Sequence, residues 1–124
     1  MTASAWQYFS KEELMCPCCE QLPMNNAFMT KLSGIRRQMK TPLQVNSGYR
    51  CKKYNESIGA KSTSAHVKGR AVDISTANLT EEQQIQLLEE AIRYGLTGIG
   101  VNDKGPREGR FIHLDNTRPR LWSY

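Results

Sequence analysis

The sequence contains only two histidines, and both lie close to aspartates along the chain. His66 precedes Asp73 by seven residues in the stretch STSAHVKGRAVDIS, with a Lys-Gly turn between them, and His113 precedes Asp115 by two. If the segments around Asp73 and His113 are neighbouring strands, these two side chains converge, and His66 can reach them from the turn before its strand. Two imidazoles and one carboxylate, with a fourth position open to water, are the ligand set of catalytic zinc. Because the spacing from His66 to Asp73 is a loose pattern, hydrogen-bonded histidines without a metal are the alternative.

Alternation of apolar and polar residues predicts the strands that would carry these side chains. In RAVDIS, Asp73 lies on the face opposite Val72 and Ile74. In RFIHLD, His113 and Asp115 share one face. The strands predicted from this period span about 43–47, 70–75, 97–101 and 110–115, and a turn-rich connection separates the last two.

Helices are predicted between and before these strands. Ser10 with Glu13 forms a capping box that starts a short helix, and apolar spacing predicts a second helix over about 25–39. A third helix begins after the capping box of Thr80 and ends near Gly95, and a helical turn is expected within the polar loop that follows Cys51. The stripe expected to face the core in the third helix consists of Ile85, Leu88 and Ile92. Helices and strands without regular alternation indicate an α+β fold with a small, mainly antiparallel sheet flanked by helices.

Composition predicts one domain that spans residues 1–124 and carries a basic surface. The chain has 39% apolar residues and a net charge of +5, with its Lys and Arg residues spread along the sequence. This balance suits an anionic partner such as nucleic acid, an acidic membrane surface or a cell-wall polymer, although a solvated surface without a specific partner fits equally well. The N-terminus resembles no signal peptide and no window is long and apolar enough for a membrane span, so we expect synthesis in the cytoplasm without membrane insertion.

The four cysteines, Cys16, Cys18, Cys19 and Cys51, are expected to be reduced thiols in such a chain. Two alternatives stay open. Cys16 and Cys19 have the spacing of a metal-binding knuckle with Cys51 as a further ligand, or a disulfide reaches Cys51. The adjacency of Cys18 and Cys19 argues against the metal site, because neighbouring side chains do not easily face one ion.

Three segments of the chain resemble the signature segments of the zinc D-Ala-D-Ala carboxypeptidase family, peptidase family M15, and especially its short phage-type members. The segments are SGYRC at 47–51, SAHVKGRAVDI at 64–74 and FIHLD at 111–115. The resemblance extends from YFSKEEL near the N-terminus to RPRLW near the C-terminus. It implies an α+β fold of the kind shared with the hedgehog signalling domain.

The resemblance also implies roles for individual residues. The zinc ligands of the family correspond to His66, Asp73 and His113, so one zinc ion per chain is expected. The arginine of the family that binds the carboxylate or the scissile carbonyl of the substrate corresponds to Arg50. Ser64 matches the first residue of the central motif and is expected to brace the loop that carries His66.

The general base departs from the family pattern. Several branches place an acidic residue three positions before the last histidine, but this chain has Arg110 there. Glu108, five positions before His113, is the candidate proton shuttle, with a solvated turn glutamate as the alternative reading. Asp115 is expected to orient an imidazole, or to pair with an arginine at 118 or 120.

The expected function is that of a zinc metallopeptidase that hydrolyses an amide bond in the peptide stems of peptidoglycan. The bond is either D-Ala-D-Ala or L-Ala-D-Glu, and the expected setting is a monomeric phage endolysin that meets the cell wall after release from the cytoplasm. The alternative is a non-catalytic zinc-binding module, as the hedgehog relationship allows, whose basic surface binds a polyanion. A nucleic-acid partner is not expected, because the aromatic residues form no stacking strip.

Overall fold

A single five-stranded sheet runs through the computed structural model, which describes residues 8–60 and 64–124. The strands are β1 (Val45–Ser47), β2 (Ala71–Ser75), β3 (Gly98–Asn102), β4 (Phe111–Asp115) and β5 (Arg120–Ser123), in the spatial order β1-β2-β4-β3-β5. Every neighbouring pair is antiparallel except β3 and β5, which are parallel. The predicted α+β class with a mainly antiparallel sheet is confirmed.

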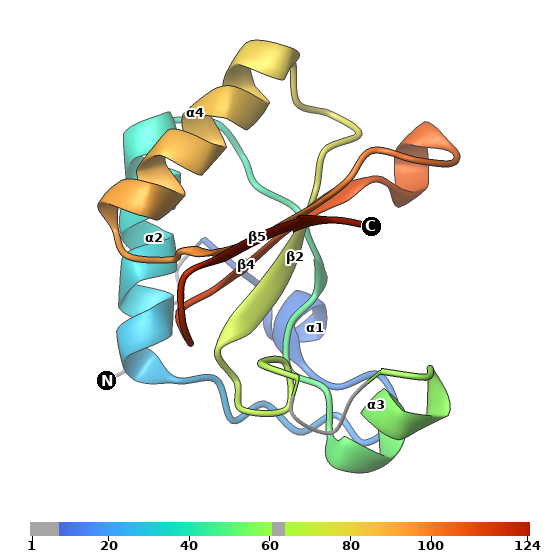
Figure 1. Cartoon of the computed structure of the whole chain (residues 1–124). Coiled ribbons are helices and arrows are strands. Elements are labelled where there is room, and N and C mark those ends of the chain that lie inside the picture. The colour runs from blue at the N-terminus through green and yellow to red at the C-terminus, as the bar shows by residue number, and fades with distance from the viewer. Residues whose placement is uncertain (1–7, 61–63) are drawn as a thin grey trace.

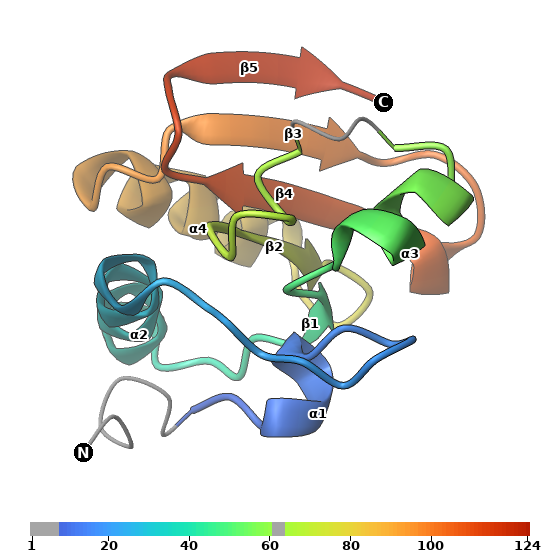
Figure 2. The ribbon, with the colours of Figure 1, turned by 90° about the horizontal axis from the view of Figure 1, so that it is seen from below.

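Helices lie on both sides of this sheet (Figures 1 and 2). They are α1 (Lys11–Leu14), α2 (Asn26–Met39), α3 (Lys52–Ser57) and α4 (Glu81–Arg93), with a short 3₁₀ helix, η2 (Arg107–Gly109), before β4. Figure 1 shows α2 and α4 side by side on one side of the sheet and α3 on the other. Within the described ranges, no helix has both the length and the apolar character needed to cross a membrane.

The core lies between the sheet and the pair α2 and α4. Phe28, Leu32 and Ile35 of α2 are fully buried, and so are the strand residues Val72 and Leu114 that belong to the same apolar cluster. Since side chains alternate along a strand, the polar residues between these apolar ones face the opposite side of the sheet. The face away from α2 and α4 is therefore free to carry chemistry.

The helix starts follow the predicted capping signals. Ser10 and Glu13 exchange both bonds of a capping box at α1, and Thr80 does the same with Gln83 at α4. The second carboxylate oxygen of Glu13 accepts a hydrogen bond from the backbone N–H of Val45 at 3.0 Å. The cap of α1 thus also ties this helix to β1, the strand that precedes Gly48 and Arg50.

The buried face of α4 differs from the prediction. Ile85 and Ile92 are 58% and 61% exposed, whereas Leu87 and Ala91 are buried. The physical reason is the close contact of α4 with α2, where the ring of Tyr94 lies over Gly34 so closely that a Cβ there would meet it at 2.6 Å. Leu88, the third member of the predicted stripe, is partly buried and packs against the core, so the prediction was right for Leu88 and wrong for the two isoleucines.

Two strands also differ from the prediction. β1 begins at Val45 rather than at 43, although Leu43 is buried. β5 was not predicted, because its four residues include the 79% exposed Leu121 and follow an Arg-Pro pair that hides the alternation. β5 pairs only with β3, so it is an edge strand of the sheet.

Gly69 offers a test of the turn that precedes β2. Its φ is +68°, and a Cβ there would overlap the carbonyl oxygen of Pro23. Gly105 has a similar φ of +78° with open space around it. Gly105→Ala should lower the free energy of unfolding by about 1 kcal/mol, the cost of the left-handed conformation. Gly69→Ala should lower it by about 3 kcal/mol or more, because the overlap adds to that cost. Urea denaturation measures both values, and equal losses would contradict the packing argument.

Candidate active site

The register of the sheet places the predicted residues in one row. Asp73 of β2 lies opposite His113 of β4, His113 lies opposite Gly100 of β3, and Gly100 lies beside Trp122 of β5. All four positions belong to the face opposite the core. A Cβ at Gly100 would overlap the indole of Trp122, so the glycine leaves the room in which this ring packs. The indole and the His113 imidazole have their centroids 5.1 Å apart.

His66 approaches this row from the turn before β2. Its backbone N–H donates to Ser64 Oγ at 3.2 Å, so Ser64 contacts the turn that carries His66. The Nδ1 atom of its ring lies 2.7 Å from the carbonyl oxygen of Gly48. Gly48 itself packs directly on the backbone of Leu14, where a Cβ would be 2.6 Å from the carbonyl oxygen. The end of α1 therefore fixes the carbonyl that orients His66.

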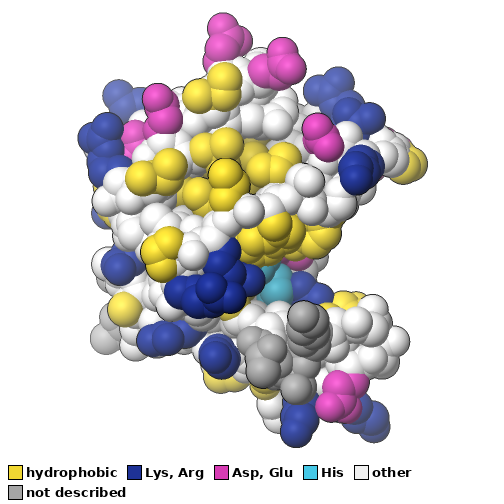
Figure 3. Space-filling view, in the orientation of Figure 1, with side chains coloured by type: hydrophobic (Ala, Val, Ile, Leu, Met, Phe, Trp, Pro, Cys, Tyr) yellow, Lys and Arg dark blue, Asp and Glu magenta, His cyan; other side chains and the backbone are white. Residues whose placement is uncertain are grey.

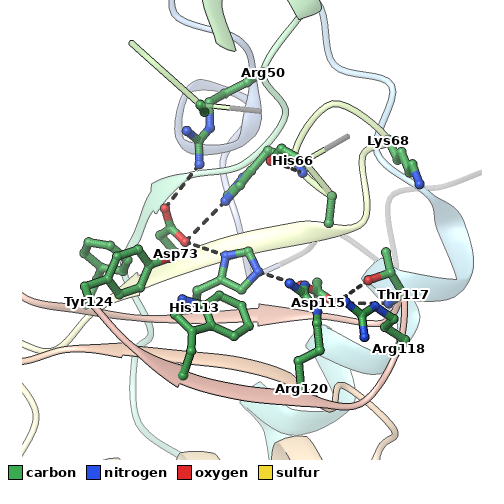
Figure 4. A pocket seen from close by; sticks show the side chains of 15 residues that line it. Arg50, His66, Lys68, Asp73, His113, Asp115, Thr117, Arg118, Arg120 and Tyr124 are labelled. Carbon is green, nitrogen blue, oxygen red and sulfur yellow. Dashed lines mark hydrogen bonds and ion pairs between the residues drawn. The ribbon is translucent and has the colours of Figure 1, made fainter. Parts of the chain in front are cut away.

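Both imidazoles direct one nitrogen at the same oxygen of Asp73 (Figure 4). His66 Nε2 lies 3.3 Å and His113 Nδ1 lies 3.0 Å from Asp73 Oδ1. The other nitrogen of each ring faces an acceptor, the Gly48 carbonyl for His66 and Asp115 Oδ2 for His113, the latter at 2.7 Å. In the neutral rings the protons therefore occupy the outer nitrogens, and two lone pairs face the carboxylate.

With the ring protons on the outer nitrogens, two lone pairs and a carboxylate oxygen converge, and this arrangement suits a cation between them. The three donor atoms lie within 4.8 Å of one another, and His66 Nε2 is buried with no hydrogen-bond partner in the described part of the chain. Two imidazoles and one carboxylate form the three-ligand set of catalytic zinc sites. Outer acceptors that fix the tautomer are typical of metal-bound histidines. The residues present therefore fit a zinc ion.

The pKa values of Asp73 and Asp115 also favour the binding of a cation. Burial raises the pKa of Asp73, but pairing with His113 and His66 outweighs it and holds this pKa well below its usual range. Burial raises the pKa of Asp115 as well, but the hydrogen bonds of His113 and Thr117 lower it to about 2. Burial lowers the pKa of His113, but its bonds to Asp115 and Asp73 outweigh this and raise it. Both carboxylates are therefore ionised at neutral pH and attract a cation.

Asp115 contacts the His113 ring at the nitrogen that faces away from Asp73. Its carboxylate is fully buried and also accepts hydrogen bonds from the backbone and the hydroxyl of Thr117 and from Arg120, the last at 2.8 Å. Gly98 of β3 has no side chain where this carboxylate lies, and a Cβ there would overlap it. Asp115 thus contacts both an imidazole and Arg120, the two kinds of partner between which the sequence left its role open.

A cleft of about 780 Å³ opens over this row. Its lining includes the three metal-binding candidates and four cations, Arg50, Lys68, Arg118 and Arg120. Phe111, Trp122 and Tyr124 line it as well. Figure 3 shows a histidine side chain in a hollow, with Lys and Arg side chains beside it and an apolar surface above it. The cleft is therefore an open, basic groove with an aromatic wall.

Arg50 lies where the sequence placed it, at the metal-binding row. Its Nη2 atom is 3.6 Å from Asp73 Oδ2, and its side chain is 13% exposed. Its Nε is buried without a hydrogen-bond partner among the described residues. The backbone N–H of Arg50 donates to the His66 carbonyl at 3.2 Å, so the segment that carries the guanidinium also holds the turn of His66.

Glu108 is not brought to the site. It lies in η2, before the first residue of β4, and it is exposed and absent from the lining of the cleft. The reason is the register, because β4 must run on from Phe111 to His113 before it reaches the row of Asp73. Asp73 and Asp115 are the only carboxylates among the lining residues that the structure describes.

Sequence reasoning missed the wall that β5 contributes. Trp122 and Tyr124 follow one another at the alternation of a strand, which was the available signal, but the segment before them contains Pro119. The sequence indicated Lys68 only as part of the Lys-Gly turn and not as a residue of the cleft. These residues line the cleft together with the metal-binding row.

His113→Ala tests the metal-binding row. The variant removes one of three ligands, so its zinc content should fall by about one equivalent per chain relative to the unchanged protein. Elemental analysis by mass spectrometry after gel filtration measures this difference, and circular dichroism checks the fold. An undiminished zinc content in folded His113→Ala protein would remove this row as a metal site.

The model of the peptidase M15 family matches residues 7–115, which is well over half of the chain. The matched range contains Arg50, His66, Asp73 and His113 and ends at Asp115, the last residue of β4. A comparison with curated proteins gave no match. Because a match of this extent identifies the family, and because the residues of the cleft form a metal-binding set, the chain belongs to the peptidase M15 family of metallopeptidases.

Proposed function

We propose that this protein is a zinc-dependent peptidase that hydrolyses an amide bond in the peptide stems of bacterial peptidoglycan. The observation that carries the proposal is the convergence of His66, Asp73 and His113 on the floor of an open cleft that Arg50 also lines. A structural metal would have no need of a cleft, so this observation favours hydrolysis over the alternative of a non-catalytic zinc module that binds a polyanion.

Zinc held by this row would supply Lewis acidity to the scissile carbonyl and to water. Residues of the chain hold the two imidazoles in place. Gly48 and Asp115 fix the two imidazoles from outside, each through the nitrogen that faces away from Asp73. Both rings are buried, and this packing restricts their rotation.

Arg50 is proposed to bind a carboxylate or the scissile carbonyl of the substrate. A guanidinium presents paired donors that match a carboxylate, and the buried Nε of Arg50 has a donor to spare. Peptide stems carry several carboxylates, and the four cations of the cleft suit them. The cut bond is then either D-Ala-D-Ala or L-Ala-D-Glu, two bonds that both lie beside a carboxylate.

The basic charge of the protein supports a proposal for where it acts. We propose that the protein acts as a monomer on the cell wall after release, as a phage endolysin does. Its net charge of +5 favours contact with anionic wall polymers.

The proposal is tested with defined muropeptides. The purified protein is incubated with stems that end in D-Ala-D-Ala and with stems that end earlier, and the products are weighed by mass spectrometry. Release of D-Ala, or cleavage between L-Ala and D-Glu, identifies the bond, and a chelator should abolish the reaction. Binding of anionic wall polymer without any cleavage would instead support the non-catalytic module.

Arg50→Lys tests the proposed substrate contact. An ammonium group cannot reproduce the paired donors of the guanidinium, so kcat/KM on muropeptide should fall by about 100-fold or more. The metal content should stay unchanged, since Arg50 is not a ligand. Arg37→Lys, an exposed change on α2 at the far side of the sheet, is the matched control and should retain full activity. Unchanged turnover in Arg50→Lys would leave Arg50 without a role in binding.

The variants Asp115→Asn and Glu108→Gln compare a carboxylate that lines the cleft with one that lies outside it. Asp115→Asn keeps the shape but weakens the hold on His113, so metal affinity and kcat/KM should each fall by about 10- to 100-fold. Glu108→Gln changes a side chain outside the cleft and should retain both. The opposite result, with activity lost in Glu108→Gln and kept in Asp115→Asn, would restore Glu108 as the proton shuttle.

A further inference from the structure

A second cluster of metal-ligating side chains lies outside the cleft. The sulfur atoms of Cys16, Cys18, Cys19 and Cys51 all lie within 4.8 Å of one another, and all four cysteines are free. The first three belong to the loop after α1, and Cys51 precedes α3. The cluster thus joins two segments that are more than thirty residues apart in the chain.

The loop after α1 closes on itself in a way that gathers its sulfurs. The backbone N–H of Cys16 donates to the Gln21 carbonyl, and that of Glu20 donates to the Cys16 carbonyl, both at 2.9 Å. Glu20 has a φ of +59°, a conformation that is costly for a residue with a side chain. The adjacency of Cys18 and Cys19 argued against a metal site in the sequence. In this tight turn, however, both residues lie on the same side as Cys16.

Backbone donors also face the sulfurs. The N–H of Cys51 donates to Cys16 Sγ at 3.3 Å, and the N–H of Tyr54 donates to Cys51 Sγ at 3.4 Å. Hydrogen bonds of this kind favour the charged form of their acceptor, here the thiolate. Thiolate, rather than thiol, is the form that binds metal.

The spacing of the sulfurs agrees with a tetrahedral ion. With Zn–S bonds of about 2.3 Å, the sulfurs of such a site are about 3.8 Å apart. Cys16 Sγ and Cys18 Sγ are 3.7 Å apart, and Cys18 Sγ and Cys51 Sγ are 3.3 Å apart. Four sulfur ligands leave no open position, which is the arrangement of structural rather than catalytic zinc.

We propose that Cys16, Cys18, Cys19 and Cys51 bind a zinc ion in a closed site of four thiolates. This site is separate from the row of His66, Asp73 and His113, so the protein holds two zinc ions rather than the one expected from the sequence. The proposal does not rest on the proposed function, since it concerns a site without an open position.

The place of this cluster gives it a structural role. The residues just before Cys51 are the ones that serve the active site, because Gly48 orients His66 and Arg50 lines the cleft. The N–H of Tyr49 donates to the Leu14 carbonyl at 2.8 Å, which holds the start of this segment against the end of α1. A metal bound to Cys51 and Cys16 holds the C-terminal end of this segment against the loop that follows α1.

The test begins with the unmodified protein under reducing conditions. After saturation with zinc and gel filtration, elemental analysis should give two equivalents of zinc per chain. A mercurial reagent that attacks thiolates should release one of them. After replacement of zinc by Co²⁺, the protein should show the intense visible and near-ultraviolet bands of tetrahedral cobalt bound to sulfur.

Two variants separate the sites. Cys51→Ser removes a ligand but keeps an oxygen that can accept the Tyr54 N–H at the start of α3, and serine is a favoured residue there. This variant should lose the sulfur-to-cobalt bands and one equivalent of zinc. His113→Ala should lose the other equivalent and keep those bands. Removal of the thiolate-bound metal should also lower the melting temperature of the His113→Ala protein.

Three results would overturn the proposal. One is a single equivalent of zinc in the reduced, unmodified protein, with no bands of sulfur-bound cobalt. Another is a disulfide between Cys18 and Cys51 in protein purified with zinc present, seen as a mass lower by two hydrogens. The third is iron rather than zinc at the cluster. All of these readouts are independent of peptidase activity, so failure of the proposed function would leave them unchanged.

Discussion

The structure depends on one electrostatic constraint, the approach of two imidazole nitrogens to a single oxygen of Asp73 at 3.0 and 3.3 Å. When the ring protons lie on the outer nitrogens, this approach brings two lone pairs against a carboxylate, and a cation between them stabilises it. The rest of the fold can be understood as the means of holding these groups together. The sheet register sets His113 against Asp73, and the turn before β2 brings His66 over them. Asp115 and the Gly48 carbonyl then prevent both rings from turning away.

Much of this arrangement could be predicted because local signals and distant contacts agree. The alternation in β2 and β4 placed Asp73 and His113 on the polar face of the sheet, and the capping boxes of α1 and α4 gave their starting residues. These features depend on residues that are near one another in the sequence. The match to the family motif added the partnership of segments that no local pattern connects, such as Arg50 with Asp73.

The features that sequence reasoning missed depend on contacts between distant segments. The buried face of α4 is set by Tyr94 over Gly34, and apolar spacing alone favoured Ile85 instead. The place of Glu108 depends on how many residues β4 needs to reach the row of Asp73. The cysteine cluster was judged unfavourable from the adjacency of two residues, whereas the left-handed conformation of Glu20 closes the turn that brings them together. Periodicity does not report on such backbone conformations.

The glycines of β3 have a consequence for how this cleft can change its substrate. Because Gly98 and Gly100 leave space that Asp115 and Trp122 fill, the strand beside the metal-binding row adds no side chain of its own to the wall. The wall instead belongs to β5, which is bonded to a single neighbour. The wall and the metal-binding row are nevertheless coupled across β3, because Arg120 of β5 donates to Asp115 and Trp122 of β5 lies beside the ring of His113. A change in β5 that alters the wall therefore leaves the row undisturbed only if it keeps these two residues.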